Sequence, residues 1–268
     1  LETFHGLDHL MNQLLGIKDD EKRLATHLEI DHCLVVSGDA DQSSRVLDEL
    51  GKTLNSTLQL LLPPGHLTIA VMGGTTMAHL ASQLTFQLSA GRELSFVPAR
   101  GGLGEAVTIQ ANSIAAAMAE ATDSKYRALY VPENLSSESY ESLIKEPSVK
   151  EVLTLIDKAQ VVIHSVGDAL VMAKRRGMSP DTIRMLKAKH AVAEAFGVFY
   201  DAEGKVVYKI PQIGLQLADL DHIPYVFAVA AGKSKAKAIA AYMQHAPSRT
   251  WLLTDVGATN SILTGATR

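Results

Sequence analysis

The chain has 268 residues and a net charge of -4, with 47% hydrophobic and 20% charged residues. These proportions are typical of a globular protein, and a chain with no excess of Lys and Arg is not expected to bind nucleic acid by charge alone. No apolar run reaches the roughly 18 residues that a membrane helix needs. A single cysteine excludes an intramolecular disulfide. We expect a cytoplasmic protein that does not contact a membrane.

The first 30 residues predict helix and no strand. Apolar residues recur at helical spacing from Leu7 to Ile17, and the charged run from Lys18 to Arg23 is predicted to begin a second short helix. We interpret residues 1–30 as a helical connector. Because the chain begins with Leu1 instead of Met, we expect it to be part of a longer protein.

Residues 31–268 alternate apolar strands with amphipathic helices. Strands are predicted over 33–36, 67–71, 94–97, 128–131, 161–164, 225–229 and 251–253, and helices over 43–62, 76–84, 106–121, 149–159 and 234–244. This alternation is typical of an α/β protein with a Rossmann-like parallel sheet and helices on both faces. Residues 198–201 and 206–210 predict a β-hairpin inserted before the sixth strand.

Ligands of such sheets bind where the strands end and the next helices begin. Gly73, Gly74, Thr75 and Thr76 follow the second strand. Glycines allow close approach of the backbone, and the hydroxyls and first helical N–H groups can donate to an anion. The alternative is a glycine turn with helix-capping threonines. The pattern is not a Walker A loop, because no Lys-Ser or Lys-Thr follows.

Basic side chains follow three other strands. Arg100 precedes the glycine-rich turn 101–104, and it is either an anion ligand or a surface residue beside a turn. Gln110 is expected one to two turns into the next helix. Arg175 and Arg176 lie on the helix after the fifth strand, where a solvated helix end is the alternative. Lys235 stands at a helix start, where its charge opposes the helix dipole unless an anion is bound.

Glu194 lies in an otherwise apolar stretch and needs a partner if it is buried. It can accept hydrogen bonds from sugar hydroxyls or pair with an arginine, and the sequence leaves both open. No metal-binding motif and no nucleophile elbow is present. We therefore expect neither a metal nor a cofactor, and we expect a small ligand with phosphates at both ends.

The segments 73–76, 96–105, 146–153 and 194–197 resemble the SorC family of sugar-responsive repressors, and the resemblance covers about residues 10–268. It implies a domain related to glucosamine-6-phosphate deaminase and ribose-5-phosphate isomerase, which gives an effector-binding domain over 31–268. It also implies an N-terminal winged-helix DNA-binding domain that this chain lacks, fructose 1,6-bisphosphate as the effector, and assembly into dimers and tetramers. The family's binding residues match at Gly73, Gly74, Thr75, Thr76, Arg100, Gln110, Arg175, Arg176, Glu194 and Lys235.

The resemblance therefore implies a repressor of glycolytic genes whose operator binding weakens when the effector binds. We expect the glycine-threonine loop and Lys235 to hold one phosphate, and Arg100, Arg175, Arg176 and Gln110 to hold the other. The alternative is a sugar-phosphate isomerase or deaminase on the same fold. The similar deaminases follow the acid at Asp168 with glycine and a catalytic histidine, whereas Ala169 and Leu170 follow here. We therefore expect no enzyme activity.

Overall fold

The computed structural model describes residues 2–102, 106–132 and 137–265, with the side chains of residues 2–10, 12 and 137 left out. A seven-stranded parallel sheet forms its centre, in the order β1-β11-β10-β5-β2-β3-β4. Its strands are β1 (His32–Val36), β2 (Gly65–Val71), β3 (Arg92–Pro98), β4 (Lys125–Tyr126), β5 (Val161–His164), β10 (Tyr225–Val229) and β11 (Trp251–Asp255). The prediction of a parallel α/β sheet is confirmed.

Helices cover both faces of this sheet because successive strand residues point to opposite sides. Ile69 and Val71 of β2 pack with α2 (Arg45–Leu61), α3 (Thr75–Ala81) and α4 (Ala111–Ala121). Ala70 belongs to the opposite core, with α6 (Pro147–Asp157), α9 (Ala236–Met243), α10 (Val256–Leu263) and the end of α1 (Glu2–Leu28). The inner strands are apolar on both faces, which is why they read as continuous apolar runs.

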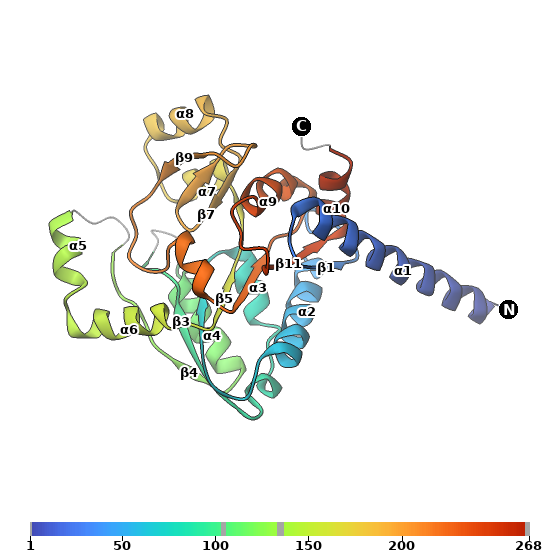
Figure 1. The fold of residues 1–268 in the computed structure, drawn as a ribbon, viewed down its shortest axis with the longest axis horizontal. Helices are drawn as coiled ribbons and strands as arrows, with labels where there is room; N and C mark the ends of the chain where they lie inside the picture. Colours follow the sequence, from blue (N-terminus) through green and yellow to red (C-terminus); the bar gives the residue numbers. More distant parts are fainter. Residues whose placement is uncertain (1, 103–105, 133–136, 266–268) are drawn as a thin grey trace.

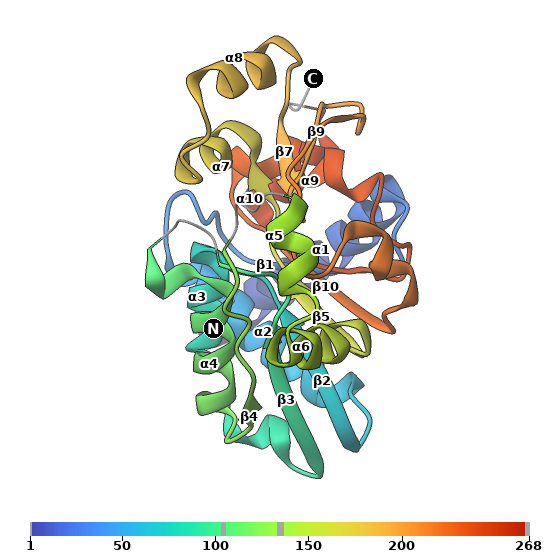
Figure 2. The same ribbon diagram turned by 90° about the vertical axis from the view of Figure 1, so that its left-hand side faces the viewer.

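A smaller antiparallel sheet lies beside the carboxyl ends of the main strands, in the order β6-β7-β8-β9 (Figures 1 and 2). Its strands are β6 (Gly167–Asp168), β7 (Ala193–Ala195), β8 (Val198–Tyr200) and β9 (Val206–Lys209). We call it, with α7 (Ala169–Arg175) and α8 (Pro180–Ala188), the inserted lobe. The predicted hairpin is confirmed as β8 and β9, whereas the sequence did not indicate the two shorter strands.

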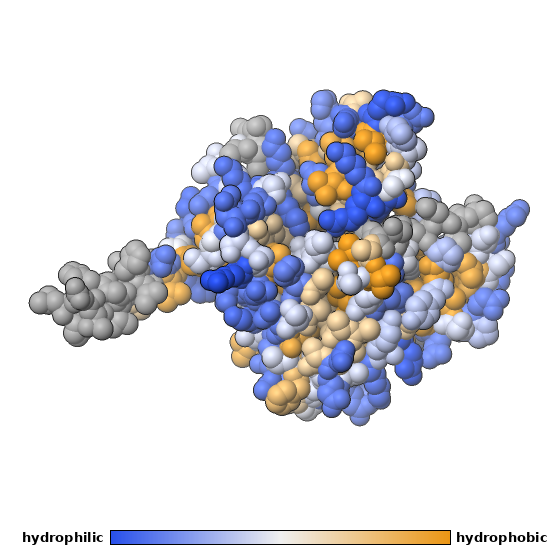
Figure 3. All heavy atoms as spheres, turned by 180° about the vertical axis from the view of Figure 1, so that it is seen from behind, coloured by the Kyte–Doolittle hydropathy of each residue, from blue (hydrophilic) through white to orange (hydrophobic). Residues whose placement is uncertain are grey.

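The remaining elements are a helix and four 3-10 turns. They are α5 (Ser137–Leu143), η1 (Phe86–Ser89), η2 (Val107–Ile109), η3 (Leu217–His222) and η4 (Lys233–Lys235). Within the described part of the chain, no helix is both long and apolar enough to cross a membrane. The face seen in Figure 3 is mostly polar, with small apolar patches.

The prediction of two short N-terminal helices is wrong, because one helix, α1 (Glu2–Leu28), spans the region and projects from the body (Figure 1). The charged run that suggested a helix start lies inside this helix. There Lys18 pairs with Glu21 at 2.7 Å and Arg23 with Asp20 at 3.4 Å, each three residues apart. Pairs at this spacing support a continuous helix.

The predicted strand over 128–131 is also wrong. The strand lies earlier, at β4, and Leu129 instead bonds to a side chain: Asn112 of α4 accepts from its N–H and donates to its C=O, both at 2.9 Å. A buried backbone must be hydrogen-bonded, and the asparagine amide supplies both partners. Leu129 and Val131 are buried, which explains why they resemble a strand in the sequence.

Candidate functional site

A pocket opens after β2 and β5, which are neighbours in the main sheet. Beyond β2 the sheet continues with β3, and beyond β5 it continues in the opposite direction with β10. Such switch points are the usual ligand sites of parallel sheets. The space that the pocket encloses is about 60 Å³, and it continues into open solvent. Nine of the ten predicted binding residues line it: Gly73, Gly74, Thr75, Thr76, Arg100, Arg175, Arg176, Glu194 and Lys235.

Gln110 is not among the lining residues, and its predicted position within a helix is wrong. Gln110 precedes α4 as its N-cap, after the turn η2. Residues 103–105, the remainder of the glycine-rich turn after Arg100, lie outside the described residues. The contribution of this segment to the site therefore stays a prediction.

The glycine-threonine loop has a structural requirement for glycine. A Cβ at Gly73 would lie 2.5 Å from the carbonyl oxygen of Ile109, and the Gly74 N–H donates to the same oxygen at 2.8 Å. Gly74 has φ of 124°, a conformation that favours glycine. The two glycines thus hold the loop against the segment before α4, which places Thr75 and Thr76 at the pocket.

Lys235 extends into the pocket, and its Nζ donates to Oγ1 of Thr76 at 3.2 Å. Its pKa is lowered, first by burial and then by the positive charge of Arg175, while Asp41 and Asp255 act in the opposite direction. The charged ammonium is therefore disfavoured in the unliganded site. An anion between Lys235 and Arg175 would remove this penalty.

The backbone N–H groups at the start of η4 already have acceptors within the chain. Asp39 accepts from the N–H of Lys233 at 3.2 Å, and Asp41 accepts from the N–H of Ser234 at 2.6 Å. Asp39 and Asp41 therefore cap η4, which is distant in the sequence, and not α2, the helix that directly follows them. The dipole argument for an anion at this turn is therefore weaker than the sequence suggested.

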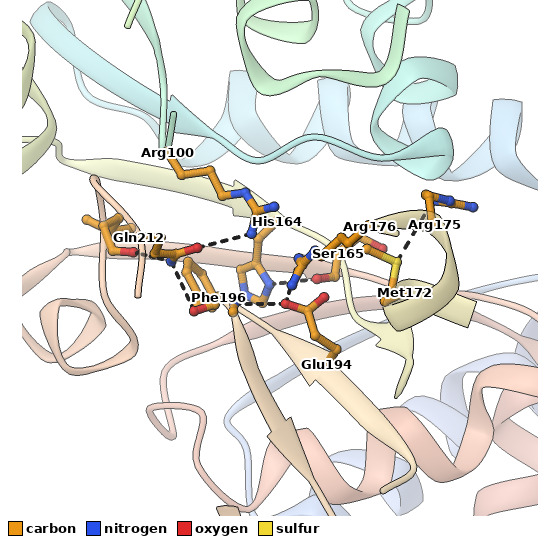
Figure 4. Close-up of polar contacts among 11 residues, drawn as sticks. Arg100, His164, Ser165, Met172, Arg175, Arg176, Glu194, Phe196 and Gln212 are labelled. Atoms are coloured by element: carbon orange, nitrogen blue, oxygen red, sulfur yellow. Dashed lines mark hydrogen bonds and ion pairs between the residues drawn. The ribbon is translucent and has the colours of Figure 1, made fainter. Parts of the chain in front are cut away.

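Glu194 of β7 pairs with Arg176, as one of the two sequence alternatives proposed. Its Oε1 lies 2.9 Å from Nη2 of Arg176, and the two side chains are only 5% and 4% exposed. The same oxygen accepts from the N–H of Gly197 at 2.8 Å. A buried carboxylate is stable only when it has both an ion-pair partner and hydrogen-bond donors. Arg176 and Glu194 both line the pocket (Figure 4).

Arg100 and Arg175 lie at opposite sides of this pair in Figure 4. Arg100 follows β3, is 3% exposed, and its Nη1 donates to Oε1 of Gln212 at 3.1 Å. Arg175 ends α7, and its Nη1 approaches the sulfur of Met172 at 3.9 Å. The sequence did not single out Gln212, which lies 112 residues from Arg100 in a loop without a motif.

His164 lies at the end of β5 beneath the pocket and is fully buried. Burial lowers its pKa to about 4, so it is neutral at physiological pH. Its ring is 4.7 Å from that of Phe196, and its Nε2 is 3.2 Å from the hydroxyl of Tyr242. The described residues contain no cluster of His, Cys, Asp or Glu that could hold a metal ion.

Asp168 is the residue that an enzyme of this fold would use as an acid or base. Its Oδ1 instead accepts from the N–H groups of Leu170 at 3.0 Å and Val171 at 2.9 Å, which caps α7. Ala169 and Leu170 directly follow it, so the adjacent histidine of the deaminases is missing. The carboxylate therefore supports the helix that carries Arg175 and Arg176.

Four cationic side chains and one carboxylate line the pocket, so its charge favours an anionic ligand. The fold and the pocket together define an α/β ligand-binding domain. Residues 13–264 match the family model Sugar-bind, described as "Putative sugar-binding domain", and the chain belongs to this family.

The relatives of known role are transcriptional regulators. The central glycolytic genes regulator of Bacillus subtilis (strain 168) is 44% identical over 262 residues, which are 98% of this chain and 76% of that protein. The transcriptional regulator LsrR of Escherichia coli (strain K12) is 30% identical, over 85% of this chain and 72% of that protein.

Solved structures of transcriptional regulators have a similar fold. "The crystal structure of the putative SorC family transcriptional regulator from Enterococcus faecalis" has a TM-score of 0.88 and 59% identity, and the match covers 91% of this chain and 99% of that one. The full-length sorbitol operon regulator SorC of Klebsiella pneumoniae, at 19% identity and a TM-score of 0.81 over 92% of this chain and 81% of that one, shows the same fold. The resemblance to the SorC family is confirmed, and the chain is the sugar-binding domain of a transcriptional regulator, not an enzyme.

Proposed function

We propose that this pocket binds fructose 1,6-bisphosphate or a closely related sugar phosphate, and that binding weakens the affinity of a repressor of glycolytic genes for its operator. The gathering of Arg100, Arg175 and Lys235 around one pocket carries the proposal. A hexose bisphosphate brings an anionic group to each end of a polar ring, which matches cations spread along the pocket. The 44% identity to two central glycolytic genes regulators supports the glycolytic role.

The contacts suggest how the charges are divided. Thr75, Thr76, Lys235 and Arg175 hold one phosphate, because Arg175 is close enough to Lys235 to lower its pKa. Arg100 holds the second phosphate from the other side of the pocket (Figure 4). This division differs from the sequence hypothesis, which grouped Arg175 with Arg100.

The paired Arg176 and Glu194 lie between the two phosphate positions and contact sugar hydroxyls. Their charges offset one another at 2.9 Å, so the pair suits neutral polar groups of the ligand better than a phosphate. A carboxylate oxygen accepts hydroxyl protons, and a guanidinium donates to hydroxyl oxygens. The pair thus favours a sugar over a simple polyanion.

Ligand binding can alter operator affinity only if the ligand binds two states of the protein differently. The pocket joins the main sheet to the inserted lobe, so a ligand contacting both favours one arrangement of the two. We propose that this arrangement is read by an N-terminal DNA-binding domain through α1, in cytoplasmic dimers or tetramers. The family match and the regulator relatives support this scheme.

Calorimetric titration with fructose 1,6-bisphosphate in phosphate-free buffer tests the proposal, with fructose 6-phosphate as the comparison. We expect the bisphosphate to bind more tightly and neither sugar to be converted. Arg175→Ala should weaken bisphosphate binding by about 100-fold, because hydrogen bonds to a charged group contribute about 1.5–3 kcal/mol. Lys174→Ala is the matched control, since Lys174 is the exposed neighbour on the same helix. Unchanged affinity in Arg175→Ala, or turnover of either sugar, would refute the proposal.

A further inference from the structure

A loop that follows the inserted lobe packs against Arg100 and lies outside the predicted motifs. Residues 210–216 connect β9 to η3 and pair with the chain that follows β3. The N–H of Gly101 donates to Ile213 at 3.0 Å, and the N–H of Leu215 donates to Ala99 at 2.7 Å. A Cβ at Gly214 would lie 2.6 Å from the Cα of Arg100. The backbone of this loop is therefore packed directly against that of Arg100.

The Gln212 amide in this loop has only one orientation that satisfies its neighbours. Its Nε2 donates to the carbonyl oxygens of Phe196 at 3.0 Å and Leu215 at 3.2 Å. Carbonyl oxygens only accept, so the nitrogen must face them, and the amide oxygen must face Arg100, which only donates. The resulting bond from Nη1 of Arg100 to Oε1 of Gln212 measures 3.1 Å (Figure 4).

The turn between β7 and β8 is shaped to admit this amide. Gly197 has φ of 73°, and a Cβ there would lie 3.0 Å from Oε1 of Gln212. Phe196 has φ of 53°, which is uncommon for a bulky residue. The N–H of Gly197 holds Glu194, which holds Arg176. One turn thus supports both buried arginines of the pocket, through Gln212 on one side and Glu194 on the other.

The two supports differ in charge. Glu194 is a carboxylate and offsets the charge of Arg176, whereas Gln212 is neutral and contacts Arg100 through its amide oxygen. A carboxylate at position 212 would also face two carbonyl oxygens with no proton to donate. An amide is therefore the group that fits between Arg100 and the two carbonyl oxygens, and it adds no negative charge beside the guanidinium.

We propose that Gln212 is a positioning residue that fixes the Arg100 guanidinium for contact with an anionic group of the ligand. The proposal rests on the proposed function for the identity of that ligand. In the proposed function, Arg100 contacts a phosphate directly and Arg176 contacts the sugar. Gln212 itself acts through Arg100, because it does not line the pocket.

Gln212→Met tests the role by removing the amide while keeping the length of the side chain. We expect about tenfold weaker binding of fructose 1,6-bisphosphate in calorimetry, the effect of about 1.4 kcal/mol. Gln212→Glu should weaken it further, because its carboxylate offsets the charge of Arg100. Equal or tighter bisphosphate binding in either variant would overturn the proposal.

Gln216→Met is the matched control. Gln216 donates to the backbone carbonyls of Gln212 and Gly214 in the same loop, at 3.2 and 2.9 Å, and neither bond involves Arg100. We expect bisphosphate affinity within about twofold of the unmodified domain, the scatter that surface substitutions give. If Gln216→Met weakened binding as much as Gln212→Met, the effect would be general loosening of the loop, and the positioning role would be wrong.

A measurement without ligand separates this inference from the proposed function. Arginine side-chain ¹⁵N NMR reports hindered rotation of a guanidinium, with the Arg100 signal assigned by its loss in Arg100→Lys. We expect restricted rotation in the unmodified domain and faster rotation in Gln212→Met. Unchanged rotation would overturn the positioning role even if the bisphosphate binds. Faster rotation together with no bisphosphate binding by the unmodified domain would support the positioning role and refute the proposed effector.

Discussion

At the scale of single residues, Lys235 links ligand binding to the stability of the empty domain. Its pKa is lowered from the ordinary value of 10.5, mainly by burial and then by Arg175. The folded state therefore binds this proton less tightly than the unfolded chain does. The resulting cost is fully present below the folded-state pKa, shrinks as the pH rises toward 10.5, and is absent above it.

Lys235→Met should therefore stabilise the unliganded domain at pH 7 and abolish tight bisphosphate binding. The difference in unfolding free energy between the variant and the unmodified domain should decrease as the pH rises from 7 toward 10. Urea denaturation in phosphate-free buffers measures this difference. Both proteins contain the same buried tyrosines, so the effect of tyrosine titration cancels in the difference. A variant that is less stable at pH 7, or a difference that does not change with pH, would contradict the argument.

Residue patterns could predict the cations of the site but not their partners. Arg100, Arg175 and Lys235 follow strands or glycine turns, and strand ends converge in a parallel sheet. Gln212 lies in a loop that reaches β3 only after folding, at a separation of 112 residues. The apolar stretch around Glu194 indicates that its carboxylate needs a partner if it is buried, but only the fold shows that Arg176 is that partner.

At the scale of elements, α7 depends on a single cap. Asp168 accepts from two N–H groups of its first turn, and α7 carries Arg175 at its end. Asp168→Ala should lower the unfolding free energy by about 1 kcal/mol and weaken bisphosphate binding, because the last turn carrying Arg175 becomes less ordered. Thermal unfolding and calorimetry measure the two effects.

Asp168→Asn is the control for this cap, because an asparagine oxygen can accept the same two bonds. We expect nearly unchanged stability and binding. If Asp168→Asn impaired bisphosphate binding as much as Asp168→Ala, the carboxylate charge itself would matter, and the capping role would not explain the effect.

The prediction of strands succeeded where apolar runs are long. It failed where the backbone is hydrogen-bonded to a side chain instead of a neighbouring strand. The inner strands β2, β5 and β10 are buried on both faces, so their sequences show continuous apolar runs. The run at 128–131 looks the same but is bonded to Asn112. Two-residue strands such as β6 leave no periodicity to detect.

At the scale of the whole molecule, the site lies between two sheets. The main sheet contributes the glycine-threonine loop, Arg100 and Lys235, and the inserted lobe contributes Arg175, Arg176 and Glu194. The sequence predicts the first set from strand alternation. For the lobe it indicates a hairpin and the helix that carries Arg175 and Arg176, but not where they lie. Their position depends on contacts such as those of the Gln212 amide with Phe196 of the lobe and with Arg100.

A ligand that contacts both sheets should stabilise the entire domain. At a free concentration 100 times its dissociation constant, a ligand bound only by the folded state adds about 2.7 kcal/mol. For a chain of this size each kcal/mol corresponds to roughly 2–4 °C, so fructose 1,6-bisphosphate should raise the melting temperature by roughly 5–10 °C. Differential scanning calorimetry measures the shift, and Arg175→Ala, with binding about 100-fold weaker, should reduce it to roughly 1–2 °C. An equal shift with inorganic phosphate at the same concentration would mean that one anion site accounts for the effect, because the sugar and second phosphate would then add nothing.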